Sequence, residues 1–189
     1  MEKADRKGGI RLKLYEYMGK EIFGSYGLPV PKGRVIDSVE ERTDFEKQAH
    51  AIGLSYVELD GDIAIMANGA GITMGTIDAI QYHGGRAANF LDAGGGSNTE
   101  ATAKALEILL VSKPKAIFIN IFGGITRCDD VAAAFAQVKA EKGIDVPVVI
   151  RLVGTNQEEG LKILRECGID AYKSMNEAAM KVVELAKLT

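Results

Sequence analysis

The residues with the strongest chemical signal are glycines and an asparagine that follow short apolar runs. They cluster at 68–71, 94–96, 123–124 and 154. The loop Gly123-Gly124-Ile125-Thr126 is the most informative, because glycine lets the backbone turn sharply and the N–H groups that open a helix have no helical acceptor. A helix starting there adds the positive end of its dipole. The loop therefore indicates a phosphate or carboxylate site that needs no basic side chain, with a purely structural turn between strand and helix as the alternative.

Other chemically active residues give weaker signals. Thr126 adds a hydroxyl to the loop, and Arg127 adds a formal positive charge. Cys128 falls in the first helical turn, where the dipole lowers a thiol pKa, but two aspartates follow it and oppose that effect, so a catalytic thiol is not expected. Two histidines do not complete a metal-ligand set, and His83 is expected to end a helix. Asp92, at the end of an apolar run, is expected to orient a loop.

The apolar runs predict the sheet that positions these loops. Each run is continuous rather than alternating, which is typical of a strand buried on both faces of a parallel sheet. The predicted strands are 63–67, 87–91, 116–122, 146–153 and 170–173. A helical pattern follows each of them, so we expect five βα units in one α/β, flavodoxin-like, doubly wound parallel sheet. In such a sheet the ligand site lies beyond the carboxyl ends of the strands, where all the glycine clusters fall.

Caps and stops delimit the predicted helices. Asn98, Asn156 and either Ser174 or Asn176 are expected N-caps. The expected stops after helices are Gly84, Gly143 and Gly168.

The first part of the chain follows a different pattern. We expect a helix over Leu14–Tyr26 that ends at Gly27, and a strand is a further option at Val35–Ile36. This arm is too short to bury a core of its own. The predicted division is an amino-terminal arm over 1–53 and one α/β domain over 54–189.

Composition excludes several classes of protein. The chain has 189 residues, 47% of them hydrophobic, and a formal net charge of −3, which supplies no basic field for nucleic acid or an anionic membrane. Its 2 cysteines cannot build a disulfide framework, and no apolar run approaches the roughly 18 residues of a membrane span. A cytoplasmic protein without nucleic-acid or membrane partners is expected.

Several motifs carry a family resemblance. The segments 66–76 (MANGAGITMGT), 88–96 (ANFLDAGGG) and 120–129 (NIFGGITRCD), with Leu54–Asp62 and His83-Gly-Gly, resemble the carboxy-terminal domain of the succinyl-CoA synthetase beta subunit. Residues 14–31 resemble the very start of the same subunit, which opens an ATP-grasp fold. In the family about two hundred residues separate the two parts, whereas here only Ser38–Gly53 stand between them. The glycine loop that holds ATP and the motif that holds magnesium are both missing, and a natural and an engineered deletion remain open.

The resemblance implies a role in an acid–CoA ligase of the tricarboxylic acid cycle. In the family a nucleotide phosphorylates a histidine of the alpha subunit, the phosphoryl group passes to the acid, and CoA displaces the phosphate. Carried over by position, Asn68, Gly124, Ile125 and Thr126 contact the substrate, and Gly123-Gly124 form the anion loop. No catalytic or metal-binding residue is expected on this chain. The resemblance implies an alpha-subunit partner in a heterodimer, a small acid (succinate or malate), and no cofactor held here, although the family uses Mg-ATP or Mg-GTP and CoA.

Two other functions stay open. One is a non-enzymatic, flavodoxin-like module that binds an alpha subunit without nucleotide chemistry. A flavin or receiver-type domain is weaker, because a receiver needs an aspartate at the end of the first strand and this strand ends at Asn68.

Overall fold

The computed structural model describes residues 16–30, 42–94 and 98–189, which form two compact units, Met1–Glu41 and Arg42–Thr189. The first unit contains one described helix, α1 (Glu16–Ser25), closed by a turn in which Gly27 takes a positive φ of 73°. This confirms the predicted helix and its stop within the described range. The option of a strand at Val35–Ile36 lies outside the described residues.

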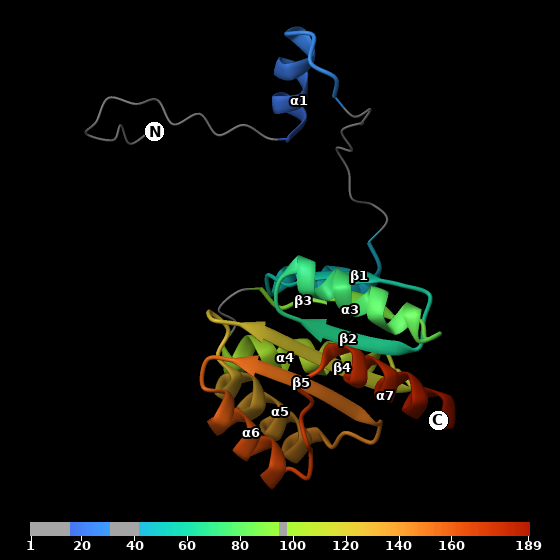
Figure 1. Ribbon diagram of the computed structural model, residues 1–189, viewed down its shortest axis with the longest axis vertical. Helices are drawn as coiled ribbons and strands as arrows, with labels where there is room; N and C mark the ends of the chain where they lie inside the picture. The colour runs from blue at the N-terminus through green and yellow to red at the C-terminus, as the bar shows by residue number, and fades with distance from the viewer. Residues whose placement is uncertain (1–15, 31–41, 95–97) are drawn as a thin grey trace, which may run out of the picture. The chain divides into compact units, whose positions relative to one another are not determined.

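The second unit is a five-stranded sheet with helices on both faces (Figure 1). Its helices are α2 (Asp44–Ala51), α3 (Ala70–Tyr82), α4 (Thr99–Val111), α5 (Cys128–Lys142), α6 (Gln157–Glu166) and α7 (Met175–Leu188). Its strands are β1 (Ser55–Glu58), β2 (Ile63–Ala67), β3 (Asn89–Asp92), β4 (Ala116–Gly123) and β5 (Val148–Gly154), in the order β1-β3-β2-β4-β5. All neighbours run parallel except β1, which pairs antiparallel with β3. The α/β, flavodoxin-like class is confirmed.

Two strands differ from the sequence expectation. The segment 170–173 makes only an isolated bridge between Arg151 and Tyr172, because Ser174 caps α7 and takes the chain away from the edge of the sheet. The fifth strand is instead β1, which buries only one of its four residues. A mostly exposed edge strand lacks the continuous apolar run by which buried strands are recognised.

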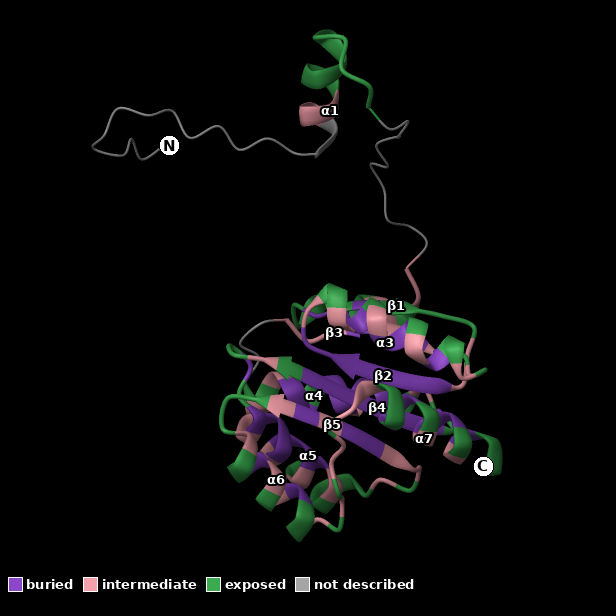
Figure 2. Ribbon diagram, viewed as in Figure 1, coloured by how far each residue is buried: buried purple, intermediate pink, exposed green. Residues whose placement is uncertain are grey.

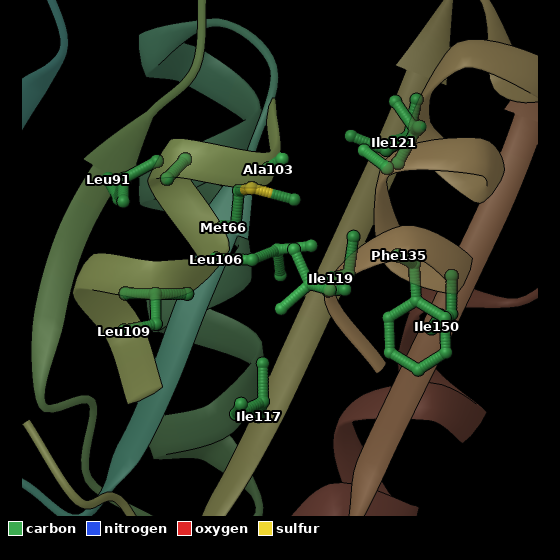
Figure 3. Packing of buried hydrophobic residues seen from close by; sticks show 14 of the residues in the cluster. Met66, Leu91, Ala103, Leu106, Leu109, Ile117, Ile119, Ile121, Phe135 and Ile150 are labelled. Atoms are coloured by element: carbon green, nitrogen blue, oxygen red, sulfur yellow. The ribbon is translucent and has the colours of Figure 1, made fainter. Parts of the chain in front are cut away.

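The core lies on both faces of the sheet. Residues of α3 and α7 pack against one face, around Phe118. Residues of α4, α5 and α6 cover the other face. There Leu106 lies beside Met66 of β2 and Ile119 of β4, and Phe135 lies beside Ile150 of β5 (Figure 3). Strand β2 is buried along its whole length (Figure 2), as its apolar run predicts. Burial of these continuous runs fixes the strands, and the strands fix where the loops at their ends lie.

The helix α2 packs with the sheet, although the sequence analysis placed it in the arm. Thr43 and Glu46 form a capping box at its start, and Ala49 is fully buried in the core. The Glu46 carboxylate also accepts a hydrogen bond of 3.0 Å from the backbone N–H of Glu58 in β1. These contacts tie α2 to β1, so the second compact unit starts at Arg42 rather than at residue 54.

Most helices begin and end at the cap and stop residues that the sequence predicts. Asn98 accepts a hydrogen bond from the Ala101 N–H, and Ser174 accepts one from the Glu177 N–H, which resolves the choice between Ser174 and Asn176. Gly84, Gly143 and Gly168 follow their helices with positive φ values. Asn156 precedes α6 but does not cap it with its side chain.

Candidate anion-binding edge of the sheet

The carboxyl ends of the parallel strands bring the predicted loops to one edge. Ala67, the last residue of β2, lies in register with Asn120 of β4 and with Asp92 of β3. Gly123 of β4 lies in register with Gly154 of β5. The loops that follow these strands are therefore neighbours, as the topology predicts.

Asn68 holds the end of β4 in place. Its Nδ2 donates to the Phe122 carbonyl at 3.0 Å and to the Thr126 hydroxyl at 3.3 Å, and its Oδ1 accepts from the Phe122 N–H at 2.9 Å. The residue is 9% exposed. The structure thus brings Asn68 to the predicted loop, but its amide is already engaged by protein groups. In this arrangement the Asn68 side chain holds the Phe122 backbone and the Thr126 hydroxyl in place.

A close approach of two backbones sets the gap between the loops. Gly154 has a φ of 146°, and a Cβ atom built on it would lie 1.9 Å from the Gly123 carbonyl oxygen. Gly123 itself has a φ of 142°. Both positions therefore require glycine for reasons internal to the chain. The consequence is that the loop after β5 lies directly against the loop after β4.

The loop 124–126 divides into an exposed and a buried part. Gly124 is exposed and Ile125 is 78% exposed, whereas Thr126 is fully buried beside Asn68. Within the described residues, the N–H groups of Gly124 and Ile125 donate no hydrogen bond. Helix α5 begins at Cys128 with Arg127 as its N-cap, later than the sequence analysis assumed. The exposed donors thus belong to the loop that leads into the helix rather than to its first turn.

Gly124 itself has room for a side chain. Its φ is not positive, and a Cβ atom there would meet nothing within 4 Å. A larger residue at this position is compatible with the fold. Any effect of such a change on binding would report on the ligand or a partner.

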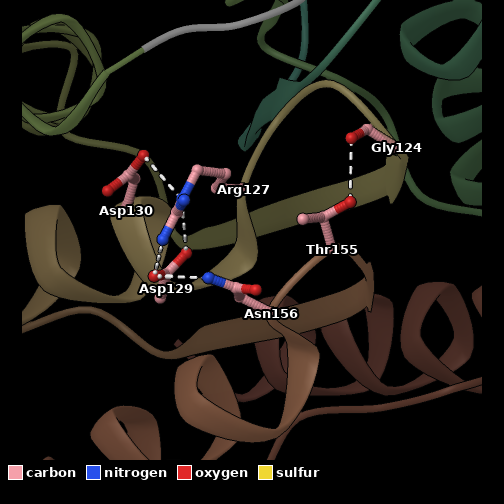
Figure 4. Close-up of polar contacts among 6 residues, drawn as sticks. All are labelled: Gly124, Arg127, Asp129, Asp130, Thr155 and Asn156. Atoms are coloured by element: carbon pink, nitrogen blue, oxygen red, sulfur yellow. Dashed lines mark hydrogen bonds and ion pairs between the residues drawn. The ribbon is translucent and has the colours of Figure 1, made fainter.

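The charges at the start of α5 do not supply a free cation. The Arg127 guanidinium pairs with Asp129 at 2.7 Å and with Asp130 at 3.6 Å (Figure 4). Hydrogen bonds from Arg127 and from Asn156 lower the Asp129 pKa to about 2. One guanidinium against two carboxylates leaves a net negative charge at the helix start. The formal positive charge that Arg127 was expected to add is present, and the chain's own aspartates balance it.

Cys128 is unsuited to nucleophilic chemistry. It is fully buried, and its pKa is raised by desolvation and then by the charge of Asp129. Its backbone N–H is also occupied, since it donates to the Thr155 carbonyl at 2.9 Å. These observations agree with the expectation that Cys128 is not a catalytic thiol.

Asp92 and His83 have the supporting roles expected of them. Asp92 Oδ1 accepts hydrogen bonds from the N–H groups of Gly69 at 2.6 Å and Gly94 at 2.7 Å, so it orients two loops of the edge. His83 ends α3, and its Nε2 lies 2.9 Å from Asn176 Oδ1. The residues with known placement contain no group of three acidic, cysteine or histidine side chains that could hold a metal. In the same part of the chain no helix is long and apolar enough to cross a bilayer.

Arg151 is a residue of this edge that the sequence analysis missed. Its guanidinium lies 4.8 Å from the centre of the Phe122 ring, donates to Asn120 Oδ1 at 3.0 Å and donates to the Lys173 carbonyl at 2.9 Å. Desolvation lowers its pKa from the usual value. A charged residue inside the apolar run 148–153 was the signal that could have marked it. It joins β4, β5 and the segment before α7.

Comparisons with known proteins show the family to which this domain belongs. The Ligase_CoA family, described as CoA-ligase, matches residues 66–184. The fold and this edge define an α/β domain of that class, and the chain belongs to the CoA-ligase family. Within that family, its relatives are beta subunits of succinate–CoA ligase.

Two such relatives are both named succinate–CoA ligase [ADP-forming] subunit beta. The chain is 47% identical over 148 residues to the protein of Desulfurococcus amylolyticus, a match that covers 78% of this chain and 39% of that one. It is 52% identical over 148 residues to that of Pyrobaculum calidifontis, covering 77% of this chain and 39% of that one. The chain thus spans about two fifths of the length of these relatives.

Solved structures share the fold at lower identity. The ATP citrate lyase of Methanothrix soehngenii, in complex with citrate and coenzyme A, matches with a TM-score of 0.65 at 22% identity, over 92% of this chain and 48% of that one. A dinucleotide-forming acetyl-coenzyme A synthetase of Ca. Korarchaeum cryptofilum in its apo form matches with a TM-score of 0.57 at 17% identity, over 94% of this chain and 43% of that one.

Proposed function

We propose that this chain supplies the carboxyl-edge loops of an acid–CoA ligase beta subunit and acts together with a separate alpha subunit. The reaction would join a small carboxylic acid, succinate or malate, to CoA and convert a nucleoside triphosphate into the diphosphate and phosphate. The catalytic histidine would lie on the alpha subunit. This chain would bind the phosphoryl group on that histidine, or the carboxylate of the acid, through its exposed loop.

The observation that carries the proposal is the pair of exposed N–H groups at Gly124 and Ile125. They lie at the carboxyl edge of the sheet, and within the described residues they donate no hydrogen bond. Backbone donors without acceptors are suited to an anion. The segment that holds them also lies within the stretch that matches the CoA-ligase family.

The charge balance supports a site that two chains share. The start of α5 carries a net negative charge, because Arg127 is matched by two aspartates. Negative charge at a helix start opposes the effect of its dipole on a bound anion. We therefore expect phosphate or succinate to bind weakly to the chain by itself and more tightly once an alpha subunit adds its own donors.

Mixing this chain with an alpha subunit tests the proposal. The wild-type chain and the alpha subunit of the Desulfurococcus amylolyticus ligase should elute together in size-exclusion chromatography.

In a folded Gly124→Val chain, the added side chain would stand where the anion must touch the backbone, so we expect affinity for succinate or phosphate to fall at least about tenfold. Gly75→Val is the matched control, because a Cβ atom at Gly75 likewise meets nothing within 4 Å. Two separate monomer peaks, or an unchanged anion affinity in Gly124→Val, would contradict the proposal.

A second candidate is a non-enzymatic module that binds an alpha subunit. The chain spans only 39% of the relatives named above, and its sequence contains neither of the ATP-grasp motifs. Co-elution fits both candidates. Transfer of the phosphoryl group from a phosphorylated alpha subunit to succinate, followed by attack of CoA that forms succinyl-CoA and releases phosphate, would favour the ligase role if both steps depend on this chain. Tight pairing without such transfer would favour the module.

A further inference from the structure

Thr155 contacts the predicted anion loop through all three of its polar groups. Its hydroxyl donates to the Gly124 carbonyl at 2.8 Å (Figure 4). Its N–H donates to the Gly123 carbonyl at 3.4 Å, and its own carbonyl accepts from the Cys128 N–H at 2.9 Å. One residue of the β5–α6 corner therefore engages the loop at its start, in its middle and where α5 begins.

The bond to Gly124 fixes the direction of the next N–H. The peptide unit is planar and trans, so the carbonyl of one residue and the N–H of the next point in opposite directions. With the Gly124 oxygen turned toward Thr155, the Ile125 N–H points away from Thr155. That N–H is one of the two exposed donors on which the proposed function rests.

The loop needs such a constraint because of its composition. Two consecutive glycines, Gly123 and Gly124, leave the peptide planes around them free to rotate at little steric cost. Rotation of the Gly124–Ile125 peptide would place the Gly124 carbonyl oxygen, instead of the Ile125 N–H, next to the bound anion. The Thr155 hydroxyl favours the orientation that attracts an anion over the one that repels it.

The position of Thr155 is itself set by the sheet. The register of β4 with β5 and the close approach of Gly154 to the Gly123 carbonyl bring the corner against the loop. Thr155 is exposed, so its side chain contributes little to the core. Its contacts are therefore better explained by the geometry of the loop than by the stability of the domain.

We propose that Thr155 is a positioning residue, whose hydroxyl holds the Gly124–Ile125 peptide with its N–H directed toward the bound phosphate or carboxylate. This inference rests on the proposed function, because it assigns the residue that prepares the same anion site. Thr155 does not itself need to touch the ligand.

The test compares two variants of the full chain. Thr155→Val keeps the branched shape and removes the hydroxyl, whereas Thr155→Ser keeps the hydroxyl and removes the methyl group. Inorganic phosphate is titrated into each ¹⁵N-labelled chain, and the Ile125 amide signal is followed by NMR. A single hydrogen bond of this kind contributes about 0.5–1.5 kcal/mol, so we expect Thr155→Val to bind phosphate about threefold to tenfold more weakly. Thr155→Ser should stay within about twofold of wild type, and both variants should unfold within about 3 °C of it, because the site is exposed.

The possible results separate this inference from the proposed function. If the wild-type chain shows a phosphate-dependent shift at Ile125 and Thr155→Val binds equally well, the positioning role is refuted while the anion site stands. If Thr155→Ser is weakened as much as Thr155→Val, the hydroxyl is not the cause and the inference also fails. If the wild-type Ile125 signal does not respond to phosphate either alone or with the alpha subunit present, the anion site and the inference are both refuted.

Discussion

Replacing Asn68 with alanine tests whether this residue is a structural clamp or a free ligand-binding group. Its amide makes three hydrogen bonds, two with the backbone of Phe122 and one with the Thr126 hydroxyl. The substitution removes all three and leaves the N–H and carbonyl of Phe122 without these partners. If Asn68 is a clamp, Asn68→Ala must lower the stability of the domain even when no ligand is present.

The magnitude follows from the burial of the groups involved. Each hydrogen bond contributes about 0.5–1.5 kcal/mol, which sets an upper bound of roughly 4.5 kcal/mol for the three. Phe122 is 47% exposed, so water can replace part of what its backbone loses. We therefore expect a loss of about 1–3 kcal/mol, which corresponds to a melting temperature lower by about 3–10 °C for a domain of this size.

The assay is thermal unfolding followed by circular dichroism, with urea unfolding as a second measurement. Asn176→Ala is the matched control, because that asparagine is exposed and, within the described residues, its side chain makes one hydrogen bond, of 2.9 Å with His83 Nε2. Its melting temperature should change by no more than about 2 °C. An Asn68→Ala chain that melts with the wild type would refute the clamp, and a loss of succinate binding at unchanged stability would restore Asn68 as a direct ligand contact.

Three further outcomes are expected. Gly154→Ala should fold poorly or melt at least about 6 °C lower, because its Cβ atom would overlap a carbonyl oxygen of β4 in a backbone conformation that strains any side chain. The Asp129 carboxyl should titrate near pH 2 by ¹³C NMR, and its pKa should move back toward the ordinary value of 3.8 in Arg127→Gln, since the guanidinium lowers this pKa. The contribution of the ionised Asp129 to stability is therefore present above about pH 4 and is lost as the pH falls toward 2. In the native chain iodoacetamide should modify Cys167 well before Cys128, which is fully buried and has a raised pKa.

Each of these outcomes has its own control. Gly75→Ala should unfold close to wild type, because a Cβ atom there has open space, and equal stability of Gly154→Ala would contradict the close approach. An Asp129 midpoint that Arg127→Gln leaves unchanged would mean that the ion pair does not form in solution. In urea both thiols should react at similar rates, and equal rates in the native chain would contradict the burial of Cys128.

The sequence could predict the parts of the site that depend on neighbours along the chain. The continuous apolar runs of β2 and β4 required burial on both faces, and topology then placed every loop at the same edge. Asn98 and Ser174 were recognisable as caps because capping joins residues two or three positions apart. The positive-φ stops at Gly84, Gly143 and Gly168 were recognisable for the same local reason. The assignment of an anion to the loop Gly123–Thr126 was made at this level as well, and it stays a prediction.

Contacts between segments that are distant in the sequence could not be predicted from such local patterns. Asn68 and Phe122 are 54 positions apart, and only the packing of β2 beside β4 brings the amide to the backbone it holds. Thr155 reaches Gly124 across 31 positions because β4 and β5 are in register. A polar side chain in a loop could form a hydrogen bond with many groups of the chain. The sequence does not show which of them the fold brings to within about 3 Å.

The sequence by itself determined the class of fold and the order of its buried strands and helices, and it pointed to the loop that we propose as the anion site, because hydrophobic periodicity, caps and glycine act over a few residues. Only the tertiary structure decided which charges and amides remain available there. In the folded chain the Asn68 side chain is hydrogen-bonded to the end of β4, and Arg127 forms ion pairs with two aspartates. The Thr155 hydroxyl donates a hydrogen bond to the Gly124 carbonyl. Hydrogen bonds and ion pairs act over a few ångströms, so their partners are settled only when the sheet has fixed the distances between the loops.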